Sequence, residues 1–266
     1  MTNKIKHVFG TYEWAVSNAN FINGCTNNCK YCYSREMAIR FKRKTTENWK
    51  IEEININQFN RKFKKVDGFV MFPSSHDITP NHLPQTINFL RRIIDAGNNV
   101  LIVSKPHFEV IEAICNEFED NKKNILFRFT IGSMDSEILK FWEPGAPDYD
   151  ERKKCLKLAY KKGFETSVSC EPMLDDKVIP LVSDLQEYVS DFLWIGKANF
   201  LHRRLKMNGF ADEETISRAN ALIDWQSDGN IKSLYRELKV NPKVKWKESI
   251  KKVLNLEIST VKGADE

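Results

Sequence analysis

The sequence predicts an α/β fold in which parallel strands alternate with helices. Six short apolar runs have the length of buried strands, and stretches with helical periodicity lie between them. Strands this apolar are typical of a parallel sheet covered on both faces. Six units predict an open, partial barrel or a doubly wound sheet, because a full barrel has eight. The strand candidates are residues 13–22, 68–73, 99–104, 125–132, 165–171 and 192–197.

Two of the intervening helices carry clear signals. In residues 82–96, apolar side chains recur at steps of three and four, which places them on one helical face. Residues 148–162 begin with Asp148 and, three positions later, Glu151, which form an N-terminal capping pair. A glycine follows each stretch, as is typical of a helix C-terminus.

Composition excludes several classes of protein. With 266 residues, 41% hydrophobic and 29% charged, the chain is too apolar to be disordered. No apolar run approaches the roughly 18–20 residues of a membrane span. The first residues lack the apolar core of a secretory signal, so we expect a cytoplasmic protein. The net charge of +5 permits a nucleic-acid partner but does not require one.

The last part of the chain differs from the rest, because it is polar, helical in pattern and rich in lysine. We therefore predict a barrel domain in residues 1–204 and a helical extension in residues 205–266 that packs on it. Within residues 231–252, lysines are interleaved with Tyr235 and Trp246. Such a run can bind a nucleic-acid strand, or it can be the solvated face of an amphipathic helix.

Three of the six cysteines lie within eight residues, in the spacing C-x3-C-x2-C, at Cys25, Cys29 and Cys32. A disulfide scaffold would be shorter and richer in cysteine. Three neighbouring thiolates can bind three irons of a cubane cluster, which leaves the fourth iron free to bind a small chelating molecule. The other cysteines are expected to be inert packing residues: Cys115, Cys155 and Cys170.

A zinc site is the alternative reading of this cysteine loop. The three thiolates would then be joined by a histidine such as His7 or His76. Zinc sites of this kind usually pair two separate cysteine couples, and the sequence contains no second couple. The spacing therefore favours an iron–sulfur cluster.

The cysteine loop resembles the signature of the radical SAM superfamily. Cys25, Cys29, Tyr31 and Cys32 match its pattern C-x3-C-x-aromatic-C. The most similar branch contains the spore photoproduct lyase-like and DNA repair photolyase-like proteins. The resemblance extends in segments over residues 10 to about 200, and its segments outside the cysteine loop are residues 72–80, 103–106, 142–147 and 167–175.

The resemblance implies a partial (β/α)6 barrel and two cofactors. The three cysteines would hold a [4Fe–4S] cluster, whose open iron is chelated by S-adenosylmethionine. One electron then cleaves S-adenosylmethionine to methionine and a 5′-deoxyadenosyl radical, which abstracts hydrogen from an unidentified substrate. We expect the electron to come from a flavodoxin-like or ferredoxin-like donor.

Several cofactor contacts are expected at the strand ends. Ser74 and Ser75 follow the second strand, where the superfamily usually binds the methionine amino group. The Gly-Gly-Glu motif that often makes this contact is absent here, so the resemblance implies that the two serines take its place. These serines can instead be helix N-caps. Lys105 ends the third strand, where the similar branch binds the methionine carboxylate. Its alternative role is that of a solvated loop lysine.

Ribose or methionine contacts are expected from the next two strands, at Thr130, Ser133, Ser169 and Glu171. Strand alternation puts Ser169 and Glu171 on one face and Cys170 on the other, which argues against Cys170 as a radical relay. The alternative for Glu171 is a structural ion pair with Arg128 or Arg152. Tyr31, Tyr33 and, at the end of the sixth strand, Lys197 are further candidate contacts.

One feature departs from the similar branch. Spore photoproduct lyase has a hydrogen-donor cysteine after its second strand, whereas residues 71–76 of this chain read Met-Phe-Pro-Ser-Ser-His. The sequence thus predicts a radical SAM enzyme with an unidentified substrate and no assigned catalytic residue. The alternatives are a nucleic-acid-directed radical lyase and a non-catalytic, zinc-bound nucleic-acid-binding module.

Overall fold

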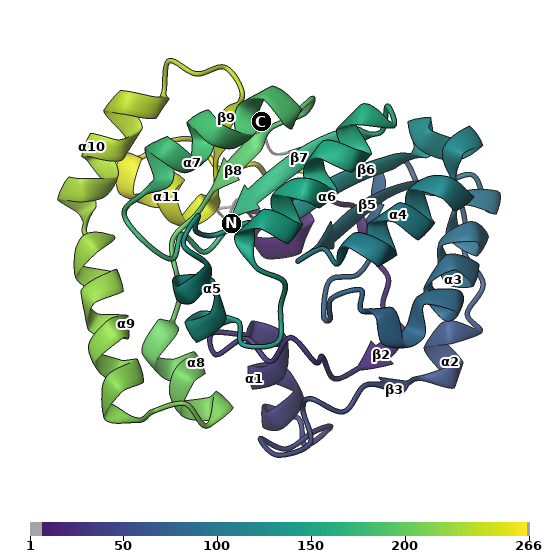
Figure 1. Cartoon of the computed structure of the whole chain (residues 1–266), viewed down its shortest axis with the longest axis horizontal. Coiled ribbons are helices and arrows are strands. Elements are labelled where there is room, and N and C mark those ends of the chain that lie inside the picture. Colours follow the sequence, from purple (N-terminus) through teal and green to yellow (C-terminus); the bar gives the residue numbers. More distant parts are fainter. Residues whose placement is uncertain (1–6, 265–266) are drawn as a thin grey trace, which may run out of the picture.

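A seven-stranded parallel sheet forms the centre of the molecule (Figure 1). The computed structural model describes residues 7–264. The order of the strands in this sheet is their order in the chain. They are β1 (Ser17–Asn18), β4 (Phe69–Met71), β5 (Asn99–Ser104), β6 (Ile125–Thr130), β7 (Glu165–Cys170), β8 (Leu193–Ile195) and β9 (Val244–Trp246). A separate antiparallel pair consists of β2 (Ile22–Asn23) and β3 (Glu53–Ile54).

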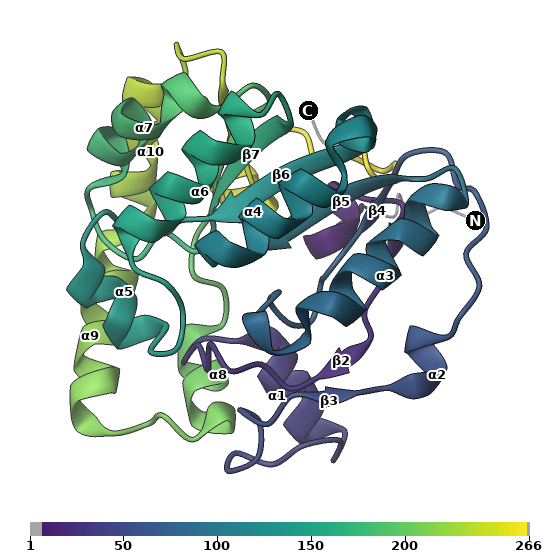
Figure 2. The same ribbon diagram turned by 45° about the vertical axis from the view of Figure 1, so that its right-hand side comes forward.

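Helices cover one face of this sheet, which is the arrangement of an open α/β barrel (Figures 1 and 2). The covering helices are α3 (Leu83–Asp95), α4 (Phe108–Glu117), α6 (Tyr149–Lys161) and α7 (Val178–Leu185). The remaining helices of the barrel are α1 (Tyr33–Arg40), α2 (Ile56–Phe59) and α5 (Ser136–Trp142). Short 3-10 turns are formed by Gly10–Glu13, Pro80–His82, Glu119–Asn124 and Gln186–Tyr188.

Strand alternation divides the buried side chains into two layers. In β5, Val100 and Ile102 join the large core between the sheet and its helices. Their neighbour Leu101 faces the other side, in a smaller cluster with Met71 and Leu126. Side chains at every second position therefore point toward the inside of the barrel, where the polar strand ends gather.

The two helices with clear sequence signals are confirmed. The predicted stretches 82–96 and 148–162 become α3 and α6. The Asp148 carboxylate accepts a hydrogen bond from the backbone N–H of Glu151, so it caps α6 as predicted. Gly97 and Gly163 follow the two helices with φ of 80° each, in the left-handed region that glycine adopts without strain.

Two predicted features of the sheet are wrong in detail. The run 13–22 is not one strand, because it contains the two-residue strand β1, the first residue of β2 and, at Glu13, the last residue of a 3-10 turn. The second difference is β9, which pairs in parallel with β8 although it lies in the lysine-rich tail. Three residues with the pattern Val-Lys-Trp are too short a run to predict a strand.

The tail is joined to the barrel along its whole length. It contains α8 (Leu201–Asn208), α9 (Glu213–Trp225), α10 (Asp228–Leu238) and α11 (Glu248–Leu254). Helix α8 crosses the predicted boundary at residue 204. In α11, Ile250 is fully buried, and Val253 and Leu254 pack against the same core, as their spacing predicted.

Two aromatic residues of the tail help to pack it on the barrel. Trp246 is buried and its ring contacts that of Tyr235 edge-on at 5.3 Å. Trp246 belongs to the large core, and the partly buried Tyr235 packs against this core. Within residues 7–264, no helix has the length and apolar character to cross a membrane.

Candidate active site

A cavity of about 760 Å³ opens at the carboxyl ends of the strands. Its volume lies in the range of small-molecule and cofactor sites. Twelve of the residues singled out from the sequence line it, namely Cys25, Cys29, Tyr31, Cys32, Tyr33, Ser74, Ser75, Lys105, Thr130, Ser169, Glu171 and Lys197.

The cysteine loop lies at one wall of this cavity and is shaped by left-handed backbone. Gly24 has φ of 98° and Asn28 has φ of 50°. A Cβ on Gly24 would lie 2.3 Å from the carbonyl oxygen of Ile51, so this position also requires glycine for space. Cys32 ends the loop as the N-cap of α1, and its sulfur accepts from the backbone N–H of Arg35.

The three thiols face one cavity without forming a site for a single metal ion. Cys25 and Cys29 are 5% and 6% exposed, and Cys32 is half-buried. Burial raises the pKa of all three thiols, so they are neutral in the metal-free chain and metal binding has to displace protons. In residues 7–264, no three His, Cys, Asp or Glu side chains lie close enough to hold one ion. The arrangement of the three thiols in this structure does not match that of a site for a single zinc ion.

Of the two histidines in the zinc alternative, His76 lines the cavity and His7 does not. The His7 ring contacts the carbonyl oxygen of Ile258 at 3.1 Å, far along the chain from the cysteine loop. The His76 ring is buried against Phe21 and Phe72, and its Nδ1 lies 2.9 Å from the Asp77 carbonyl oxygen. Burial lowers the pKa of His76, which keeps this ring neutral.

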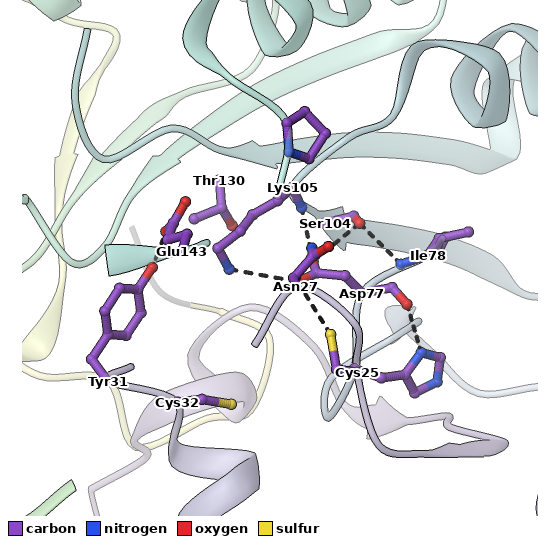
Figure 3. A network of polar contacts seen from close by, with 12 residues as sticks. Cys25, Asn27, Tyr31, Cys32, Asp77, Ile78, Ser104, Lys105, Thr130 and Glu143 are labelled. Carbon is purple, nitrogen blue, oxygen red and sulfur yellow. Dashed lines mark hydrogen bonds and ion pairs between the residues drawn. The ribbon is translucent and has the colours of Figure 1, made fainter. Parts of the chain in front are cut away.

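Asp77 connects the cysteine loop with the end of β5 (Figure 3). One carboxylate oxygen accepts from Asn27 Nδ2 at 2.9 Å, and the Cys25 sulfur lies 3.9 Å away. The other accepts from the Ser104 hydroxyl at 3.1 Å and the Lys105 backbone N–H at 2.8 Å. The sequence does not reveal that Asp77 joins these two segments, because its hydrogen-bond partners Ser104 and Asn27 lie 27 and 50 residues away.

Lys105 points from the end of β5 into the same cavity. Its Nζ lies 3.6 Å from an Asp77 carboxylate oxygen and 5.9 Å from the centre of the Tyr31 ring. Burial alone would lower the pKa of Lys105, but Asp77, Cys29 and Tyr31 outweigh burial and raise it well above its ordinary value. Lys105 is therefore a fixed cation beside the cysteines and not a solvated loop lysine.

A buried ion pair supports the cysteine loop from the opposite side. Tyr31 donates a hydrogen bond to the carboxylate of Glu143, which pairs with Arg152 at 2.5 Å. Both charged side chains are fully buried. The loop backbone is held as well, because the N–H of Lys30 donates to the carbonyl oxygen of Trp142 at 2.8 Å. The segment 142–147 thus acts as the support of the cysteine loop.

Gly145 allows this support to lie close to the loop. Its backbone N–H donates to the Asn27 carbonyl oxygen at 3.0 Å, and a Cβ at this position would lie 2.2 Å from the Thr26 carbonyl oxygen. We expect Gly145→Ala to displace the cysteine loop, at a cost of about 1–3 kcal/mol, and to lower the iron bound per chain after anaerobic reconstitution.

Gly229→Ala is the matched control, because a Cβ on Gly229 in α10 meets nothing within 4 Å. This variant should bind as much iron as the natural chain. Equal iron content in the two alanine variants would show that the close approach at Gly145 does not matter for the loop.

Ser74 and Ser75 are held by Asn20 rather than by a helix. The Asn20 amide oxygen accepts from the backbone N–H groups of both serines, and Asn20 Nδ2 donates to the Ser74 hydroxyl at 2.8 Å. The next helical turn begins at Pro80. The alternative interpretation as helix N-caps is therefore wrong for both residues.

Thr130 and Ser169 lie side by side on β6 and β7 and both line the cavity. Ser133 does not line it. This residue is fully buried, and its hydroxyl donates to the Asp175 carboxylate and accepts from the Asp135 backbone N–H. Ser133 lies three residues beyond Thr130, the last residue of β6. The prediction of a cofactor contact at Ser133 therefore finds no support.

Glu171 pairs with neither predicted arginine. Its carboxylate lies 3.6 Å from the Nζ of Lys247, a buried lysine from the tail that also pairs with Glu13 at 2.8 Å. Arg128 pairs with Asp191 at 2.8 Å. Burial raises the pKa of Glu171, although Lys247 opposes this effect. Lys247 was not singled out from the sequence, because it is one of many lysines in residues 231–252 and only the fold brings it to the barrel.

The tail also holds the cysteine loop directly. The fully buried side-chain amide of Asn208 donates from Nδ2 to the carbonyl oxygens of Lys30 and Cys32, each at 2.9 Å. In the same helix, the Arg204 guanidinium lies 6.0 Å from the Tyr33 ring. Helix α8 is therefore one wall of the site.

The three scattered cysteines lie outside the site, as predicted. Cys115, Cys155 and Cys170 are each 2% exposed or less and belong to the core under the helices. None of them lines the cavity. Strand alternation thus places Cys170 away from the polar face that carries Ser169.

The residues present fit an iron–sulfur cluster with a polar ligand beside it. Three thiols supply the donor set that such a cluster requires. Two buried N–H groups of the lining, Trp14 Nε1 and Trp49 Nε1, have no hydrogen-bond partner among the described residues. Buried donors without partners are unfavourable unless a bound group satisfies them.

An open parallel barrel with a three-cysteine loop at the ends of its strands is the arrangement of an iron–sulfur enzyme. The family model for the radical SAM superfamily matches residues 19–178. The chain belongs to this superfamily, as its cysteine signature predicted, and membership implies cleavage of S-adenosylmethionine by an iron–sulfur cluster. No curated protein matches the sequence.

Solved structures with the same fold include two variants of spore photoproduct lyase. One, with dinucleoside spore photoproduct, has 16% identity and a TM-score of 0.54, over 79% of this chain and 64% of that chain. The other, with bound AdoMet and the same ligand, has 15% identity and a TM-score of 0.53, over 78% and 63%. SuiB of Streptococcus suis, bound to precursor peptide SuiA, has 11% identity and a TM-score of 0.50, over 93% and 52%.

The chain thus spans less than two thirds of the length of these neighbours. At such identities the likeness concerns the fold alone. The partial-barrel fold predicted from the sequence is confirmed, with β9 as an additional strand of its sheet.

Proposed function

We propose that this protein is a radical SAM enzyme that uses a [4Fe–4S] cluster, bound by Cys25, Cys29 and Cys32, to cleave S-adenosylmethionine. The observation that carries the proposal is the cavity onto which all three cysteines and Lys105 converge. When bound, the cluster supplies one electron that cleaves the sulfonium to methionine and a 5′-deoxyadenosyl radical, which abstracts hydrogen from a substrate.

The chain's own residues divide the binding of the cofactor among them. Lys105 provides a buried cation for the methionine carboxylate, and Asp77 fixes its position. The hydroxyl oxygens of Ser74 and Ser75, which line the same cavity, are the acceptors for the amino group. Further contacts come from the hydroxyls of Thr130 and Ser169 and the carboxylate of Glu171, which suit ribose. Tyr31 and Tyr33 complete the cofactor contacts.

An anaerobic turnover assay tests the proposed function. Reconstituted protein reduced with dithionite should absorb broadly near ~400 nm and release 5′-deoxyadenosine from S-adenosylmethionine, as measured by mass spectrometry. Substrate candidates can then be scored by deuterium transfer into 5′-deoxyadenosine. A colourless, zinc-containing protein without this product would support the non-catalytic alternative.

The substrate chemistry of spore photoproduct lyase is not part of the proposal. Its hydrogen-donor position after the second strand has no cysteine here, and none of Cys115, Cys155 and Cys170 lines the cavity. A nucleic-acid-directed lyase remains the second candidate. It is supported by the mild excess of positive charge and by the likeness of the fold to spore photoproduct lyase. The absence of any binding to DNA or RNA at low salt would exclude it.

Lys105→Ala should weaken binding of S-adenosylmethionine without loss of iron. A charge-assisted hydrogen bond contributes about 1.5–3 kcal/mol, so we expect the dissociation constant to rise roughly 10- to 100-fold. Equilibrium titration of the reconstituted protein measures this constant, and iron analysis checks the cluster. Lys161→Ala, at an exposed position on α6, is the control. If Lys105→Ala bound the cofactor normally, Lys105 would not be its carboxylate ligand.

A further inference from the structure

A basic and apolar surface lies directly outside the cysteine loop, on the segment that follows α1 (the bottom of Figure 1). We define the α1 loop patch as Arg40, Phe41, Lys42, Lys50 and Ile51, all of which are exposed. Phe41 and Ile51 are 58% and 57% exposed. Large apolar side chains at this exposure, within a group of cations, are typical of a surface that binds a partner.

The positive charge of the α1 loop patch is not neutralised within the chain. None of Arg40, Lys42 and Lys50 forms an ion pair with any residue in the described part of the chain. The nearby carboxylates are used locally. Glu53 pairs with the buried Lys44 at 2.7 Å, and Glu47 accepts from the Thr46 hydroxyl.

The α1 loop patch is separated from Cys25 by a single buried side chain. Trp49, next to Lys50, is 3% exposed and packs against Cys25. The backbone N–H of Cys25 donates a hydrogen bond to the carbonyl oxygen of Trp49 at 3.0 Å. The carbonyl oxygen of Ile51 accepts from Lys44 Nζ at 2.9 Å. The patch is therefore fixed to the loop that carries the cysteines.

We propose that the α1 loop patch is the docking surface for a small acidic electron-carrier protein that reduces the cluster. This inference rests on the proposed function, which requires one electron from outside. The carrier's flavin or iron–sulfur centre is oxidised by one electron and the cluster is reduced by one, and no bond forms or breaks. Charge complementarity steers the encounter, and the apolar centre supplies the contact of a small, transient interface.

The geometry of Phe41 favours a protein over a nucleic acid as the occupant. The guanidinium groups of Arg40 and Arg43 lie 5.8 Å and 5.9 Å from the centre of its ring. The ring is therefore already flanked by cations and is less open to a stacked base. The exposed aliphatic side chain of Ile51 adds nothing to stacking but suits the apolar part of a protein interface.

Charge reversal tests this proposal. In the reconstituted full chain, Arg40→Glu/Lys42→Glu should slow reduction of the cluster by pre-reduced flavodoxin or ferredoxin at least ~10-fold at low salt. Stopped-flow bleaching near ~400 nm measures the rate, and the two carriers, used separately, distinguish the two sources of the electron. Reduction by dithionite should be unchanged. Phe41→Ser should weaken carrier binding with little effect on its salt dependence.

The matched controls lie on α10 and directly after it, far from the cysteine loop in Figure 1. Lys232→Glu/Lys239→Glu makes the same change in charge, and Val240→Ser removes an apolar side chain that is 79% exposed. These variants should accept electrons from the carriers as the natural chain does.

Three results would overturn the proposal. In the first, the patch variants are reduced by the carriers as fast as the natural chain. In the second, the patch variants lose as much of their rate of reduction by dithionite as of their rate of reduction by the carriers. In the third, the patch variants lose binding to DNA or RNA and keep binding to the carriers. Direct titration of each carrier against the natural and variant chains gives a readout that does not need turnover. If dithionite yields no 5′-deoxyadenosine from the natural chain, the proposed function fails, and this titration still decides the docking surface.

Discussion

Cys29→Ala protein is expected to be colourless after anaerobic reconstitution and to form no detectable 5′-deoxyadenosine. Cys29 is 6% exposed and lies in the wall of the cavity with the other two thiols. With only two thiolates left, the loop cannot hold three corners of a cubane cluster. Iron and sulfide analysis, absorption near ~400 nm and mass spectrometry of the reaction products measure the loss. Cys25→Ala and Cys32→Ala should behave in the same way.

Cys115→Ala is the matched control for these variants. Cys115 is also buried, but it lies in α4 within the core under the helices. Its replacement leaves a small cavity and should leave the iron content and the yield of 5′-deoxyadenosine unchanged. Equal loss of iron in Cys115→Ala and Cys29→Ala would show that the assignment of the cluster ligands is wrong.

Glu143→Ala is expected to be the most destabilising single replacement near the site. It leaves the guanidinium of Arg152, which is fully buried, without its charged partner, and it removes the acceptor of the Tyr31 hydroxyl. Loss of one partner from a buried ion pair costs about 3–5 kcal/mol. Urea unfolding of the metal-free chain should show this loss in the free energy of unfolding, and iron retention should fall because Tyr31 lies inside the cysteine loop.

Glu214→Ala removes another glutamate from a pair with arginine and serves as the control. The pair between Glu214 and Arg218 lies on the surface of α9, with side chains that are 66% and 49% exposed. Such pairs contribute about 0–1 kcal/mol, so unfolding should change little. A Glu143→Ala chain that unfolded like Glu214→Ala would show that the buried pair is not what supports the cysteine loop.

The parts of the fold that could be predicted are those set by local pattern. The buried strands β5 and β6 are mainly apolar runs, and α6 has its cap and its closing glycine in the sequence. Strand β9 could not be predicted, because a three-residue strand gains its stability from pairing with β8 and not from its own pattern.

In the candidate site, too, the part that could be predicted is local in the sequence, and the part that could not depends on the fold. The spacing of the cysteines identifies the loop, because the loop is one continuous segment. The groups that position it come from distant parts of the chain, such as Asp77, Glu143 and Asn208. Each of these looks like an ordinary polar residue in the sequence, since only the fold brings it to the loop. Ser133 shows the converse, because one polar residue near a strand end can belong to the adjoining loop.

The position of Lys247 has a consequence for the order of events during synthesis. Lys247 joins Glu13, near the start of the described chain, to Glu171 in the barrel, and it follows directly on β9. Synthesis has to proceed from Glu13 to Lys247 before these ion pairs can form. Until Lys247 emerges from the ribosome, Glu13 and Glu171 lack their shared cation, and the inner face of the barrel is incomplete.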